Sequence, residues 1–198
     1  MTWAATATGS RNRVVQRFGG GATVTIRRHH TLVNRSTGDA VSKLALDGAV
    51  TAGDSTLSLK KQHLVGDLPI GITFKLAGDA TTYTTTNAVK AESSALADVT
   101  FSPVAAANAA TEIPVLLQTE YADYSFLASS KRFRREEVDG STVQTGDRQI
   151  ALSALAEPVA IDDQDQVIFN GKLYEIVGVD LHTHGSTNTG TTLHVRGV

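Results

Sequence analysis

The chain has 198 residues, of which 41% are hydrophobic and 19% charged, and it contains no cysteine. This length is enough for one domain or two small ones, and the composition is that of a folded chain. The absence of cysteine excludes disulfides, thiolate metal sites and cysteine nucleophiles. No apolar run approaches the roughly 20 residues of a membrane-spanning helix, and we expect a water-soluble protein made in a reducing cytoplasm.

Charge is unevenly distributed along the chain. Residues 1–44 carry seven Lys or Arg and one Asp, a net charge of +6, whereas residues 119–198 carry seven bases and twelve acids, a net charge of −5. A basic N-terminal segment attached to an acidic remainder favours contact with a partner of opposite charge, which includes a second copy of the chain. The alternative is an ordinary solvated basic arm.

The first predicted strand follows the glycine triplet at 19–21, which we interpret as a hinge after a basic arm of residues 1–20. Residues 22–27 alternate polar and apolar side chains, the pattern of a half-buried strand. The triplet does not indicate a phosphate-binding loop, because no Gly-Lys-Ser/Thr follows it and a strand rather than a helix comes next.

Residues 47–117 differ in character from the rest: they are rich in Ala, Thr and Asp and poor in arginine. Strict alternation at 56–59 and 72–76 predicts strands, and shorter ones are expected at 81–86 and 99–101. We interpret 47–117 as a small β domain inserted into a host domain formed by residues 1–46 and 118–198. Such an insertion requires the two ends of the inserted domain to lie close together.

The clearest local prediction is a hairpin in the C-terminal third. Residues 166–169 and 173–177 flank Asn170-Gly171, a dipeptide that tolerates the two positive φ angles of a type I′ turn. Residues 148–152 also alternate, and residues 192–196 predict a last strand beside the hairpin. With Gly-Asp turns recurring along the chain, the predicted fold class is all-β: a small β-barrel or sandwich host domain with an inserted second small β domain.

Two clusters could carry metal chemistry. Alternate strand positions face the same way, so Asp180, His182 and His184 are weak candidates for a metal site. These histidines lead into the loop 185–190, which favours solvated side chains instead. No Gly-x-Ser-x-Gly motif occurs, and we expect a protein that is not an enzyme and has no cofactor.

The second cluster comprises Asp162, Asp163 and Asp165, just before the hairpin. It lacks the glycine and the distal glutamate of a calcium loop, which favours a charged turn. Were the protein annular, these aspartates would be candidates for facing the lumen, where negative walls would keep DNA phosphates from adhering.

A dense basic run with one aromatic residue spans 131–135 and is followed at once by two glutamates. A protein–protein contact is the favoured interpretation, with a solvated strand face or nucleic-acid binding as alternatives. The residues predicted to form protein interfaces are Trp3, Arg11, Arg13, Arg17, Phe18, Lys131, Arg132, Phe133, Arg134 and Arg135.

Five segments of the chain have a distinctive order and spacing: 24–27, 124–127, 138–154, 165–179 and 193–197. Together they resemble the head–tail connector, or head-closure, proteins of the neck of tailed bacteriophages. The resemblance is densest in the last 80 or so residues, and the minimal connector lacks the insert, which resembles small β domains of other virion proteins.

The resemblance implies a structural virion protein located at the neck and assembled in the host cytoplasm. It would form a homo-oligomeric ring that joins the portal or its adaptor to the tail terminator or tail tube, helps retain or pass DNA, and contacts no membrane. The alternatives are a tail terminator, tail-completion or decoration protein of the same virion, a metal-dependent or sugar-binding β protein, and a nucleic-acid binder.

Overall fold

The computed structural model describes residues 22–60, 64–92, 95–96, 98–133, 137–152, 161–184 and 187–198. Within these ranges all regular structure is β-strand, which confirms the predicted all-β class. None of these residues belongs to a helix long and apolar enough to cross a membrane. The strands are β1 (Ala22–His29), β2 (Val33–Asn34), β3 (Lys43–Ala45), β4 (Thr56–Leu57), β5 (Leu64–Leu68), β6 (Thr73–Leu76), β7 (Tyr83–Thr85), β8 (Val89–Glu92), β9 (Ala95–Leu96), β10 (Val99–Ser102), β11 (Pro114–Leu117), β12 (Tyr121–Arg132), β13 (Arg148–Leu152), β14 (Gln166–Phe169), β15 (Lys172–His184) and β16 (Thr187–Gly197).

The chain divides into two compact units. The inserted unit is Arg28–Ala122, and the barrel unit is formed by Met1–Arg27 and Asp123–Val198. The ends of the inserted unit lie side by side, since the His30 N–H donates to the Glu120 carbonyl at 3.0 Å. The predicted segment 47–117 lies within this unit. The unit is longer because β2 pairs with β5 and β3 pairs with β11.

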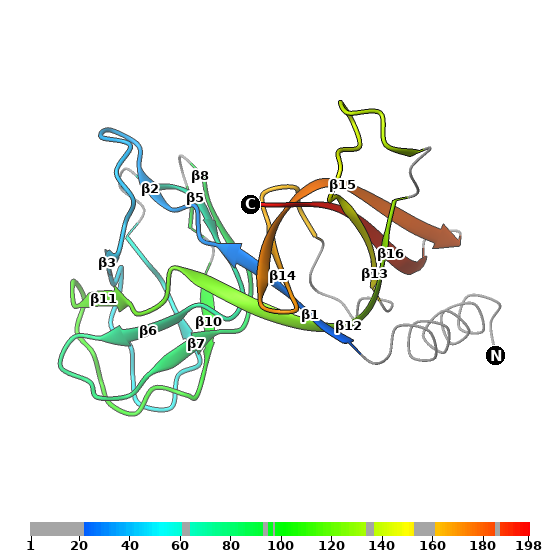
Figure 1. The fold of residues 1–198 in the computed structure, drawn as a ribbon. Helices are drawn as coiled ribbons and strands as arrows, with labels where there is room; N and C mark the ends of the chain where they lie inside the picture. The colour runs from blue at the N-terminus through cyan, green and yellow to red at the C-terminus, as the bar shows by residue number, and fades with distance from the viewer. Residues whose placement is uncertain are drawn as a thin grey trace. The chain divides into compact units, whose positions relative to one another are not determined.

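The barrel unit is a closed six-stranded barrel in the order β1-β12-β13-β16-β15-β14 (Figure 1). The predicted hairpin is confirmed: β14 and β15 pair antiparallel around Asn170 and Gly171, whose φ angles are 52° and 71°. β16 pairs with β15 along most of its length, as expected for a last strand beside the hairpin.

The core of the barrel follows from two-residue periodicity, because alternate residues of every strand point inward. Its largest fully buried members include Ile26, Ile150, Leu152 and Leu193. The register places Ile150 opposite both Ser130 of β12 and Leu193 of β16. Inward-facing positions that lie beyond these core residues are found at the two ends of the barrel. The full buried cluster is Val24, Ile26, Ala128, Ile150, Leu152, Val167, Phe169, Tyr174, Ile176, Leu193 and Val195.

The inserted unit contains a six-stranded sheet, β3-β11-β6-β7-β10-β4, and a four-stranded sheet, β2-β5-β8-β9 (Figure 1). The predicted strands around 56–59, 72–76, 81–86 and 99–101 all belong to the larger sheet. The aromatic rings of Phe74, Tyr83 and Phe101 pack together with centroids 5.2–5.7 Å apart. This cluster gives the unit a core of its own.

Candidate functional site

Three cations occupy one end of the barrel. Arg132 ends β12 and lies directly opposite Arg148, which begins β13. Lys172 begins β15 and pairs with the buried Phe169. Arg148 is two residues from the buried Ile150, and Lys172 is two residues from the buried Tyr174. Because alternate strand residues face the same side, the three cations continue the inward-facing rows just beyond the buried core. We call Arg132, Arg148 and Lys172 the cationic mouth.

The cationic mouth surrounds a hollow of about 1100 Å³. Its lining includes apolar side chains, among them Phe133, Leu173 and the buried Tyr174. Gly197 of β16 lies opposite Tyr174 and has no side chain to fill the space between neighbouring strands. The strand ends therefore leave an open hollow lined by both apolar and positively charged side chains.

The three side chains of the cationic mouth have no hydrogen bond or ion pair with any residue that the structure describes. Like charges directly opposite one another on neighbouring strands destabilise the pair. The facing Arg132 and Arg148 therefore lower the stability of the fold. Two guanidinium groups on facing strand positions are nonetheless suited to binding one carboxylate or phosphate between them.

An ion pair between the buried Asp147 and Arg196 fixes the loop that forms one wall of this hollow. The Asp147 side chain is 1% exposed. Its Oδ1 accepts a hydrogen bond from Nε of Arg196 (3.0 Å), and its Oδ2 accepts one from Nη2 of Arg196 (2.9 Å). Nε2 of His194 lies 2.8 Å from Oδ2, and the Gln144 N–H donates to the same oxygen at 2.9 Å. His194 and Arg196 are two residues apart on β16 and so share its outer face.

The charge state of Asp147 follows from these partners. The Arg196 guanidinium holds the pKa of the Asp147 carboxyl well below its usual range, against the opposing effect of burial, and the Gln144 N–H and His194 reinforce it. The same pair raises the pKa of Arg196. Asp147 is therefore an ionised residue that positions the loop before β13 against β16, and its charge is already neutralised.

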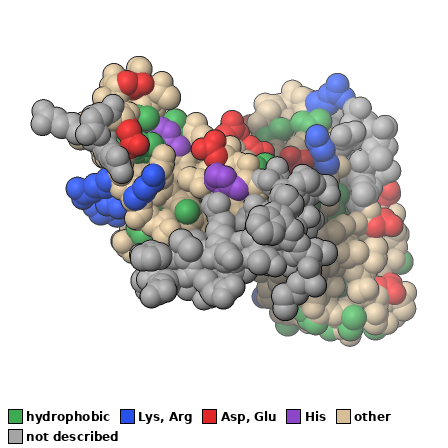
Figure 2. All heavy atoms as spheres, turned by 90° about the vertical axis from the view of Figure 1, so that its right-hand side faces the viewer, with side chains coloured by type: hydrophobic (Ala, Val, Ile, Leu, Met, Phe, Trp, Pro, Cys, Tyr) green, Lys and Arg blue, Asp and Glu red, His purple; other side chains and the backbone are tan. Residues whose placement is uncertain are grey.

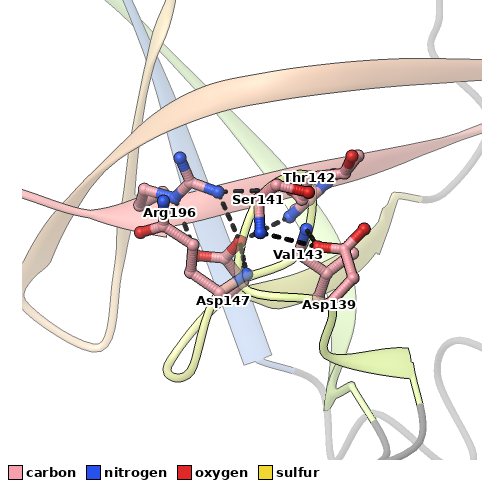
Figure 3. A network of polar contacts seen from close by, with 8 residues as sticks. Asp139, Ser141, Thr142, Val143, Asp147 and Arg196 are labelled. Carbon is pink, nitrogen blue, oxygen red and sulfur yellow. Dashed lines mark hydrogen bonds and ion pairs between the residues drawn. The ribbon is translucent and has the colours of Figure 1, made fainter.

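The loop from Asp139 to Asp147 is further fixed by its own turn (Figure 3). Oδ1 of Asp139 accepts the N–H groups of Val143 (2.9 Å) and Ser141 (2.8 Å), which lower the pKa of this carboxyl. Arg196 also donates to the Thr142 carbonyl at 3.3 Å. The loop that walls the hollow is thus attached to β16 at two points, which gives this side of the hollow a defined structure.

Phe133 is partly buried beside the hollow. Its ring meets that of His194 edge-on, with centroids 4.7 Å apart. Of the predicted interface residues, Arg132 and Phe133 therefore line the hollow, and Lys131 is exposed one residue before them. The predicted Trp3, Arg11, Arg13, Arg17, Phe18, Arg134 and Arg135 lie outside the described residues.

The acidic turn lies at the other end of the barrel. It precedes Gln166, which pairs with Glu175, whereas the cationic mouth lies beyond the Phe169–Lys172 end of the same hairpin. Asp162 and Asp163 are exposed. Asp165 is 2% exposed and accepts the Asp162 N–H at 2.9 Å, which makes it a structural residue of the turn. The predicted lumen-facing set thus divides into two exposed carboxylates and one buried one.

The same end carries an exposed apolar residue. Leu181 is 59% exposed and pairs with the buried Thr191, which itself pairs with Leu152 of the core. Leu181 therefore belongs to the inward set, beyond the last core layer. This end of the barrel combines negative charge with apolar surface, and the opposite end combines positive charge with apolar surface.

The three residues of the predicted metal candidate all lie on β15. Asp180 is exposed, and His182 Nε2 lies 3.0 Å from Thr192 Oγ1. A register shift falls between His182 and Thr183, and the side chain of His184 lies outside the described part. Among the residues that the structure describes, no three His, Asp or Glu side chains are grouped to hold a metal.

One face of the molecule bears separate small patches of acidic, basic and hydrophobic side chains (Figure 2).

Comparison with known proteins gives no relative: no family model, curated protein or solved structure matches the chain.

Sequence reasoning missed Arg148, Lys172 and the Asp147–Arg196 pair. One usable signal was present, because His194 and Arg196 alternate with the apolar Leu193 and Val195 and must share the outer face of a strand. The position of Lys172 directly after Asn170-Gly171 also places it at an end of the predicted hairpin.

Proposed function

We propose that the chain is a structural protein of the neck of a tailed bacteriophage, where copies of it form a ring between the portal or its adaptor and the tail. In this role it has no catalytic residues. Its working surface is made by the contacts between copies and with the layers above and below, and DNA passes through the ring without specific binding.

The observation that carries the proposal is where the resembling segments fall. The five segments that resemble neck connectors supply every strand of one closed barrel: residues 24–27 lie in β1, 124–127 in β12, 138–154 contain β13, 165–179 contain β14 and begin β15, and 193–197 lie in β16. Pieces that are each a common β pattern thus belong together in a single structural unit.

The distribution of charge also supports an assembling protein. At one end, the barrel unit has cations without a partner among the residues that the structure describes, and at the other end it has exposed carboxylates. The chain also has a basic N-terminal segment. Such complementary surfaces on one subunit are what contacts between copies use to fix orientation and exclude wrong partners.

The test is to locate the protein and image it. The purified full chain, examined by negative-stain electron microscopy, is expected to give annular particles, and antibody labelling of phage particles is expected to mark the head–tail junction. A protein found at the tail tube end or over the capsid surface would instead be a terminator or a decoration protein. A protein absent from virions would overturn the proposal.

A further inference from the structure

We infer that the cationic mouth of one barrel binds the acidic end of the barrel of a second copy, with Asp163 directed at Arg132 and Arg148. This inference rests on the proposed function, since it names the contact by which copies associate. The first step is that the mouth is suited to receive an anionic group, because three cations that have no partner within the described ranges line one hollow.

The second step concerns what kind of anion fits. A phosphate backbone would be held by the cations alone, whereas the lining of the hollow also includes the apolar side chains of Phe133, Leu173 and Tyr174. Protein interfaces combine a desolvated apolar centre with a polar rim. When a partner covers apolar side chains, water is excluded and ion pairs formed next to them become stronger. A protein segment that carries both carboxylates and apolar side chains therefore fits better than nucleic acid.

The third step identifies that segment within this chain. Asp163 is exposed, has no cation partner among the described residues, and stands in a turn held by the buried Asp165. The exposed Leu181 lies at the same end of the barrel. The turn presents an exposed carboxylate at an end of the barrel that also exposes Leu181. It is therefore complementary to the cationic mouth in charge, and this end also offers an apolar side chain.

The fourth step is the geometry of association. The mouth and the acidic turn lie at opposite ends of one barrel, so a subunit cannot satisfy both with itself. A contact between two different surfaces of the same protein is head-to-tail, and it produces a ring when the rotation between copies closes and a filament when it does not. The contact therefore suits the annular assembly of the proposed function.

The experiment is a charge reversal and its compensation in the full chain, followed by sedimentation velocity. The Arg132→Glu/Arg148→Glu variant and the Asp163→Arg variant are each expected to raise the dissociation constant for self-association at least about tenfold. The combination of all three substitutions is expected to restore association, because the charges are then exchanged across the contact. Circular dichroism of each variant verifies the fold.

The matched control reverses two exposed or partly exposed lysines of the inserted unit, Lys43→Glu/Lys75→Glu, which changes net charge equally. This variant is expected to associate like the wild type. The inference is overturned by equal weakening in the control or by a failure of the combined variant to recover. It is also overturned if the Arg132→Glu/Arg148→Glu variant loses binding to a DNA duplex while its self-association is unchanged.

The remaining outcomes separate this contact from the proposed function. Annular particles that persist unchanged in the Arg132→Glu/Arg148→Glu variant overturn the contact and leave the neck ring protein standing. A wild-type chain that is monomeric at all concentrations also overturns the contact, and labelling at the head–tail junction then decides the proposed function by itself.

Discussion

The carboxylate of Asp147 and the guanidinium of Arg196 meet side by side, with two nitrogen–oxygen distances of 3.0 and 2.9 Å, although the residues are 49 positions apart. The pair joins the loop before β13 to β16 and thereby sets the wall of the hollow. The contacts of Asp147 lead to the first two predictions below.

Asp147→Asn is expected to lower the free energy of unfolding by about 2 kcal/mol, the scale of hydrogen bonds made to a charged group. The amide keeps the size of the side chain but cannot accept from all of Arg196, His194 and Gln144. Urea unfolding measures the change. Asp163→Asn is the control, because Asp163 is exposed, and a loss as large in the control would contradict the assigned role.

The stability of the barrel unit is expected to fall with acid. Because Arg196 lowers the pKa of Asp147 in the folded state, the unfolded chain binds more protons than the folded chain as pH falls. The contribution of Asp147 is therefore complete at pH 7 and lost progressively below about pH 5. The difference in urea midpoint between wild type and Asp147→Asn should shrink from pH 7 to pH 3, and a constant difference would exclude this linkage.

Arg148→Gln is expected to stabilise the barrel unit by about 0.5 kcal/mol, because it removes a like-charge pair with Arg132 across β12 and β13. The measurement is thermal unfolding at low protein concentration. The gain should diminish in high salt, which screens exposed charges. Lys131→Gln serves as control, since Lys131 faces the neutral Gln149, and it should change little.

Gly66→Ala is expected to destabilise the inserted unit by about 3 kcal/mol or more, as severe backbone clashes do. Gly66 has a φ of 114°, and an added Cβ would lie 2.1 Å from the Thr31 carbonyl oxygen. Gly78→Ala is a matched control, with a φ of 89° and open space around it, so only strain of about 1 kcal/mol is expected. Hydrogen exchange of the β5 and β6 amides measures both, and equal losses would contradict the clash.

Thr85→Val is expected to cost about 2 kcal/mol in the inserted unit, because it leaves two buried backbone groups without partners. The Thr85 hydroxyl donates to the Pro69 carbonyl at 2.8 Å and accepts the Ile72 N–H at 3.1 Å, and the residue is 1% exposed. Thr85→Ser keeps the hydroxyl and should retain most of the stability in urea unfolding. A serine variant as unstable as the valine variant would assign the loss to packing instead.

The parts of the fold that local chemistry determines were predictable from sequence. The Asn170-Gly171 turn specifies its hairpin through two positive φ angles, and alternation marks β1, β6 and β13. The bounds of the inserted unit were less accessible, because β2 and β3 are two and three residues long and carry no readable period. They become strands only through pairing with β5 and β11.

The candidate site was only partly predictable for a related reason. Arg132 and Phe133 stood out in a basic run, but Arg148 joins them through the register of β12 and β13. Lys172 joins them only because β16 lies between β13 and β15 in the closed barrel. The Asp147–Arg196 pair likewise requires knowing that β13 lies beside β16. The register between strands that are far apart in the sequence is set by closure of the barrel, so it cannot be read from any short stretch of sequence.

The bond between His30 and Glu120 has a consequence for how such a protein could evolve. Since the chain leaves and returns through adjacent backbone, the residues between these two points could be exchanged for a short turn or for another module without altering the pairing of any strand in the barrel. The architecture therefore allows an accessory domain to be gained, lost or exchanged at this position while the barrel stays intact.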